Sequence, residues 1–106
     1  MDHDARRKEI IKQMARIDCM EKGRLSEEYR EKFRDGQIVK LGPYYKHQCW
    51  EDGRNVSRRV PVSQVEQLRK AVDGYHEFED LAKEYAEITI EMTRQPAVDG
   101  VKKKQR

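Results

Sequence analysis

Hydrophobic residues in the second half of this chain return every three or four positions. From residue 63 to residue 94 this spacing is typical of one long amphipathic helix. Ser63 and Glu66 match the capping-box pattern at its start, and Pro96 closes its end. Gly74 lies within it and indicates either a close approach by a neighbouring element or a kink. The apolar stripe of this predicted helix consists of Val65, Leu68, Val72, Tyr75, Phe78, Ala82, Tyr85, Ile88 and Met92.

A second helical pattern covers residues 4–22. Its apolar positions are Ile10, Ile11, Met14 and Ile17, with Met20 as a possible extension. Asp2 or Asp4 is suited to cap the start, and Gly23 stands where a helix commonly stops.

Residues 24–34 fit two structures. Ser26 followed by Tyr29 and Phe33 suits a short capped helix, and the Glu and Lys content slightly favours this alternative. The same apolar residues, with Leu25, also alternate as in a strand. The Asp35-Gly36 pair then predicts a turn.

Residues 37–60 have the pattern of strands. A short strand, 37–41, is predicted to end in a turn at Gly42-Pro43. Residues 44–50 and 55–60 are predicted to form a hairpin around the Asp-Gly pair at positions 52 and 53, and Pro61 ends it. Alternation places Tyr45, His47 and Cys49 on one face, and Tyr44, Lys46, Gln48 and Trp50 on the other.

These patterns together predict an α+β fold. It has an N-terminal helix, a small antiparallel sheet of two or three strands, and a long C-terminal helix that packs on the first. Residues 1–94 are expected to form one domain, and residues 95–106 a flexible basic tail.

Composition predicts a small core. Hydrophobic residues make up 36% and charged residues 41% of the chain, against typical values of roughly 45–50% and about 25%. Such a chain is expected to complete its core by dimerising or by docking on a partner. Net charge is +3 in residues 37–62, −4 in residues 63–94 and +3 in residues 95–106, so a polyanion should meet the hairpin rather than the long helix.

The sequence favours a cytoplasmic protein without a membrane partner. No segment approaches the ~18 apolar residues of a membrane span, and the charged N-terminus has no secretory pattern. Cys19 and Cys49 are expected to be free thiols in a reducing compartment.

The hairpin and the following helix resemble a small family of bacterial and archaeal proteins that are often encoded beside transposases. The matching residues are Gly42, Pro43, Tyr44, Tyr45, Asp52, Gly53, Val60, Pro61 and Tyr75. The resemblance covers residues 23–94 and implies that residues 24–33 form a strand. Members of the family commonly carry a cysteine-rich loop before the Gly-Pro-Tyr-Tyr element. This chain has EKFRDGQIVKL there, so a metal-binding role does not carry over.

Candidate catalytic chemistry is sparse. His47 and Cys49 would share one strand face, but no third group is placed to orient them. The chain has neither a glycine-rich phosphate loop nor a metal-ligand spacing. We therefore expect no enzymatic activity, no cofactor and no metal.

The basic hairpin is the best functional candidate, because a two-stranded ribbon fits the major groove of DNA. The residue types suited to phosphates and base edges are Tyr44, Lys46, His47, Arg54, Asn55, Arg58 and Arg59. Alternatively, these cations only keep an edge strand soluble, over a core of Tyr45, Trp50, Val56 and Val60. The leading hypothesis is a non-enzymatic, DNA-associated accessory or regulatory protein of a mobile element.

The alternative hypothesis is a protein–protein adaptor or helical oligomerisation module. Its partner would be a transposase, another protein or a second copy of the chain. The helix face available for such a contact comprises Leu68, Val72, Tyr75, Phe78 and Tyr85, unless these residues pack within the chain.

Overall fold

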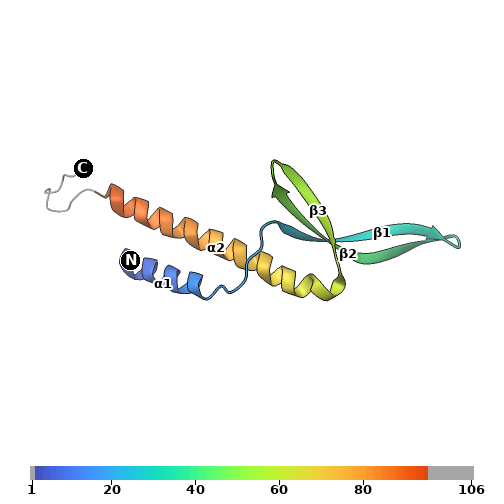
Figure 1. Cartoon of the computed structure of the whole chain (residues 1–106), viewed down its shortest axis with the longest axis horizontal. Coiled ribbons are helices and arrows are strands. Elements are labelled where there is room, and N and C mark those ends of the chain that lie inside the picture. The colour runs from blue at the N-terminus through green and yellow to red at the C-terminus, as the bar shows by residue number, and fades with distance from the viewer. Residues whose placement is uncertain (1, 96–106) are drawn as a thin grey trace. The chain divides into compact units, whose positions relative to one another are not determined.

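The computed structural model describes residues 2–95, which form two helices and a three-stranded sheet (Figure 1). The elements are α1 (His3–Ala15), β1 (Arg24–Arg34), β2 (Gln37–Glu51), β3 (Arg54–Val60) and α2 (Val62–Arg94). This order confirms the predicted α+β fold. The chain divides into two compact units, and α2 contributes residues to both. That residues 1–94 form one domain stays a prediction. Apart from Gln95, the predicted basic tail lies outside the described residues.

The helical unit contains α1 and the part of α2 from Glu77 onward. The two helices run antiparallel, because the start of α1 meets the end of α2: Arg6 pairs with Glu84, and His3 lies 3.8 Å from Glu91. Ile10 is fully buried against two α2 residues, Leu81 and Ile88. The partly buried residues around them are Met14, Ile17, Tyr85 and Met92.

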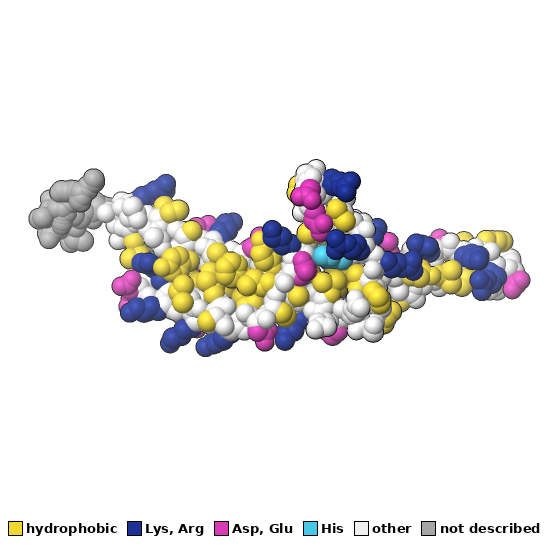
Figure 2. All heavy atoms as spheres, in the orientation of Figure 1, with side chains coloured by type: hydrophobic (Ala, Val, Ile, Leu, Met, Phe, Trp, Pro, Cys, Tyr) yellow, Lys and Arg dark blue, Asp and Glu magenta, His cyan; other side chains and the backbone are white. Residues whose placement is uncertain are grey.

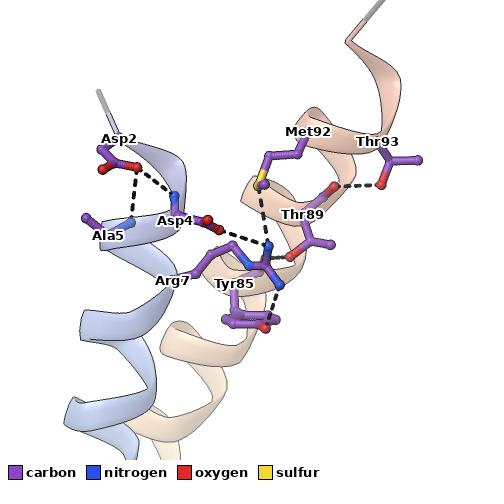
Figure 3. A network of polar contacts seen from close by, with 8 residues as sticks. All are labelled: Asp2, Asp4, Ala5, Arg7, Tyr85, Thr89, Met92 and Thr93. Atoms are coloured by element: carbon purple, nitrogen blue, oxygen red, sulfur yellow. Dashed lines mark hydrogen bonds and ion pairs between the residues drawn. The ribbon is translucent and has the colours of Figure 1, made fainter. Parts of the chain in front are cut away.

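Polar contacts stabilise the helix pair where α1 begins and α2 approaches its end (Figure 3). Asp2 caps α1 by accepting hydrogen bonds from the backbone N–H groups of Asp4 and Ala5. The guanidinium of Arg7 donates to the Tyr85 hydroxyl at 2.9 Å and lies 4.9 Å from the centre of its ring. A single arginine of α1 therefore holds α2 by a hydrogen bond and by a cation–π contact.

The first helix is shorter than predicted, since it ends at Ala15 rather than at residue 22. The following residues connect to the sheet instead, and the backbone N–H of Glu21 donates to the carbonyl oxygen of Ala71 in α2. Gly23 is not a helix stop. Its φ is +97°, and a Cβ there would lie 2.3 Å from the carbonyl oxygen of Gln48. Tertiary contacts therefore override the local helical pattern after Ala15.

The sheet-containing unit, Asp18–His76, is built on an antiparallel sheet with the order β1-β2-β3. Residues 24–34, which the sequence left open, form a strand. Both predicted Asp-Gly turns are present, and in each of them φ is positive at both residues. Positive φ at two successive residues is typical of the tight turns that match the twist of a hairpin.

The turn predicted at Gly42-Pro43 is wrong, because β2 continues through it as one strand of 15 residues. The register instead shifts here: Glu28 pairs with Tyr44, but Arg30 pairs with Leu41, and the Gly42-Pro43 peptide bond is cis. This irregularity is a β-bulge, which accommodates a proline that has no N–H to donate to the ladder.

The bulge is followed by a two-stranded ribbon, residues 30–41. β3 pairs only with residues 45–51 of β2, so among the described strands these residues pair only with each other. α2 begins at Val62, one residue before its predicted start. Ser63 consequently lies in its first turn, rather than at the predicted cap.

Candidate nucleic-acid interface

Strand alternation gives the sheet two faces with different charge. The outer face carries the even-numbered residues of β1 and the odd-numbered residues of β3. From β2 it carries residues 37, 39 and 41 before the bulge and the even-numbered residues after the bulge. Its cations are Arg24, Arg30, Lys32, Arg34, Lys46 and Arg59, and its single carboxylate is Glu28. The inner face carries three cations and three carboxylates, which are Lys40, Arg54, Arg58, Glu27, Glu31 and Glu51. The outer face is therefore strongly basic, and the inner face is neutral.

Contacts between side chains confirm the outer face. The guanidinium carbons of Arg30 and Arg59 lie 5.0 and 4.5 Å from the centre of the Tyr44 ring. One aromatic ring of β2 thus gathers a cation from each neighbouring strand. Lys46 Nζ lies 2.9 Å from a carboxylate oxygen of Glu28. This hydrogen bond holds the pKa of Glu28 below its ordinary value, so the carboxylate is ionised at neutral pH and its charge offsets that of Lys46.

The outer face is open to solvent. Arg24, Arg30 and Arg59 are exposed, and Trp50 is 70% exposed beside its cross-strand partner Asn55. Figure 2 shows Lys and Arg side chains spaced along the arm formed by β1 and β2. Exposed guanidinium and ammonium groups near an exposed indole are suited to phosphates and to stacking on nucleobases.

Four of the seven residues predicted from the sequence share this face: Tyr44, Lys46, Asn55 and Arg59. The other three belong to the inner face.

His47 is buried, and its Nε2 lies 2.7 Å from the carbonyl oxygen of Lys22, so it holds the connector before β1. Arg58 points to the same side as His47 and lies 3.5 Å from Glu51, while Arg54 is the cross-strand partner of Glu51. The sequence selected these three residues by their side-chain type alone, and the sheet places them on the face opposite the other four predicted contacts.

Sequence reasoning missed the contribution of β1. Arg24, Arg30, Lys32 and Arg34 all occupy even-numbered positions and therefore share one side of a strand, which is a detectable signal. It was hidden because residues 24–34 also fit a helix, in which these residues would not share a side.

The predicted partner face of α2 is distributed over both units. Val72 is buried, and Leu68 and Tyr75 are half-buried, in the sheet-containing unit. Phe78 and Tyr85 are half-buried in the helical unit, where Tyr85 packs on the core and accepts from an α1 arginine. Leu81, which the predicted stripe omitted, is buried in that core.

The inner face borders a hollow of about 480 Å³ within the sheet-containing unit. Its lining comes from Glu21, from β2 and β3, and from the first turns of α2, among them His47, Arg58 and Leu68. Within residues 2–95, no group of three or more His, Cys, Asp or Glu side chains is placed to hold a metal ion. Over the same residues, no helix is long and apolar enough to cross a membrane. Cys19 and Cys49 are free.

Comparisons with protein-family models, with curated proteins and with solved structures found no match. The resemblance described from the sequence therefore stays an expectation.

Proposed function

We propose that this protein binds double-stranded DNA through the outer face of its sheet and acts as a non-enzymatic accessory or regulatory protein of a mobile element. The observation that best supports DNA binding is the difference in charge between the outer and the inner face of the sheet. Charged side chains of either sign keep a strand soluble, whereas the outer face carries six cations and a single carboxylate. The resemblance of residues 23–94 to proteins encoded beside transposases supports the mobile-element role.

The dimensions of the sheet fit a groove. The two strands of the ribbon lie about 4.8 Å apart, and the major groove of DNA, about 12 Å wide, admits such a two-stranded ribbon. Five residues on each strand give the ribbon a length of about 17 Å. Arg30, Lys32 and Arg34 follow one another along that length on the outer face. Such spacing places cations along a phosphate backbone, while Tyr44 holds Arg30 and Arg59 in a defined orientation.

A gel-shift assay of the full chain on duplex DNA at low salt tests the proposal. A retarded complex is expected, and its abundance should fall steeply as salt is added. Absence of any complex at low salt would refute DNA binding. A complex that forms equally well after Arg30→Ala and Arg59→Ala would refute the assignment of the outer face.

A further inference from the structure

The inner side of the ribbon carries large hydrophobic residues in water. Phe33 and Ile38 are cross-strand partners next to the Asp-Gly turn, and they are 68% and 70% exposed. Tyr29 lies on the same side, four residues before Phe33 in β1, and is 49% exposed. Scattered apolar residues are common on protein surfaces, but a cluster on one side of a ribbon indicates an interaction site.

The charged pair between these residues is placed for self-recognition. Glu31 and Lys40 are cross-strand partners on the same side, one step from the Phe33–Ile38 pair. Lys40 also lies over the Tyr29 ring, with its Nζ 4.9 Å from the ring centre. We name this surface the ribbon apolar face, comprising Tyr29, Glu31, Phe33, Ile38 and Lys40.

A two-fold axis parallel to the strands makes this surface complementary to itself. Rotation about such an axis lays β1 of one copy over β2 of the other without shifting the pairs along the strands. Phe33 then meets Ile38 of the second copy, and Glu31 meets Lys40 of the second copy. Both contacts occur twice, as an isologous interface requires.

We propose that two copies of this chain dock through the ribbon apolar face about such a two-fold axis. The partner is a second copy of the chain, because Glu31 and Lys40 of each ribbon lie opposite Lys40 and Glu31 of the other ribbon. The outer faces remain free, so the dimer presents two basic surfaces directed away from each other. The inference does not depend on DNA binding.

The contact area predicts a weak dimer. A whole aromatic side chain offers roughly 150–250 Å², so the exposed part of Phe33 contributes about 100–170 Å². If the exposed parts of all five side chains are covered on both copies, the interface reaches about 1,000 Å² in total, the lower limit for a specific interface. An interface of this size belongs with weak, transient contacts, so association is tested at chain concentrations from about 10 μM to about 1 mM.

Sedimentation equilibrium of the full chain, without nucleic acid, tests the apolar contact. The wild-type chain should approach twice the monomer mass as concentration rises through that range. Phe33→Ala with Ile38→Ala should weaken association by more than about tenfold. Both residues are exposed, so circular dichroism should show unchanged folding. A wild-type chain that stays monomeric, or a double variant that associates as well as wild type, would overturn the proposal.

Charge reversal tests whether Glu31 and Lys40 lie in the interface between the two copies. Glu31→Lys places two cations opposite each other across the axis, and Lys40→Glu places two carboxylates there. Each variant alone is expected to be monomeric, whereas an equimolar mixture should form a heterodimer, because every lysine then faces a glutamate of the other chain. Effects within one chain cannot produce this rescue. A mixture that stays monomeric while the wild type dimerises would exclude this geometry.

These experiments separate the proposed dimer from the proposed DNA binding. The Phe33→Ala, Ile38→Ala variant retains every outer-face cation and should still give a gel shift, with a complex of lower mass. Loss of association with a retained gel shift supports both proposals. Association without any gel shift supports the dimer and refutes only DNA binding.

Discussion

Removal of Arg30 and Arg59 should lower the salt dependence of DNA binding by a calculable amount. The outer face carries six cations, and Lys46 is neutralised by Glu28, so five remain for phosphates. With all five engaged, the slope of log Kobs against log salt is about −4.5. Affinity should then fall about 500-fold between about 50 and about 200 mM salt.

The double variant Arg30→Ala, Arg59→Ala leaves three such cations. Its slope should be about −2.7, and the loss of affinity over the same salt range about 40-fold. Fluorescence anisotropy of a labelled duplex, titrated with the full chain at several salt concentrations, gives both slopes. The difference between slopes is more informative than either affinity, because it counts the phosphate contacts that were lost.

Arg54→Ala with Arg58→Ala is the matched control, since it removes the same charge from the inner face of the same sheet. Its slope should remain near the wild-type value. An equal decrease in both double variants would show that net charge, rather than the outer face, drives binding. An unchanged slope in the Arg30, Arg59 variant would refute the counting argument directly.

Three further predictions concern stability. Ile10→Ala should lower the free energy of unfolding by about 2–5 kcal/mol, because Ile10 is fully buried. Ile11→Ala, at a position that is 51% exposed, should lower it by at most about 0.5 kcal/mol. Urea unfolding followed by circular dichroism measures both values, and equal losses would refute the assigned core. A hydrogen bond from its arginine partner lowers the pKa of Glu84 from 4.5, so this carboxylate stabilises the fold above about pH 4.5 and stops doing so as the pH falls through its lowered pKa. Glu84→Gln should therefore flatten the acid limb of the Tm-against-pH curve, and an unaltered limb would contradict this pairing. Gly23→Ala should lower Tm more than Gly36→Ala, since both have positive φ but only Gly23 lies against a backbone oxygen; the reverse order would be evidence against that contact.

The parts of the fold that could be predicted are those set by local chemistry. The long helix follows from one apolar period, and its observed start differs by a single residue. The Asp52-Gly53 hairpin follows from the turn that this dipeptide favours. Asp2 was one of two acidic residues expected to cap the first helix, and it does so.

The parts that could not be predicted depend on distant contacts. Helical periodicity continues past Ala15, but the chain leaves the helix because it must reach the sheet. Before it does so, the backbone N–H of Glu21 donates to the carbonyl oxygen of Ala71 in α2. Gly42-Pro43 has the composition of a turn, yet a neighbouring strand pairs on both sides of it and turns it into a bulge. Short-range propensity has no information about that neighbour.

The candidate site was predicted by residue type but not by face. The basic character of the hairpin was evident, and Tyr44 and Arg59 were among its predicted contacts. His47 could be excluded from the predicted DNA contacts only once the carbonyl group of Lys22 was known to lie beside it. The cations of β1 could be added only once residues 24–34 were known to be a strand.

The bulge at Gly42-Pro43 limits how the length of this protein can change. Because side chains alternate, a slip of one residue moves every side chain of a strand to its opposite face. Deletion of one residue between Glu28 and Phe33 would bring Phe33 to the side of Tyr44 and the cations to the opposite side. Substitutions at single positions of the ribbon change one contact, whereas a single-residue insertion or deletion in β1 moves all the following side chains of β1 to the opposite surface. Homologous ribbons are therefore expected to vary in sequence more freely than in the number of residues between the bulge and the tip.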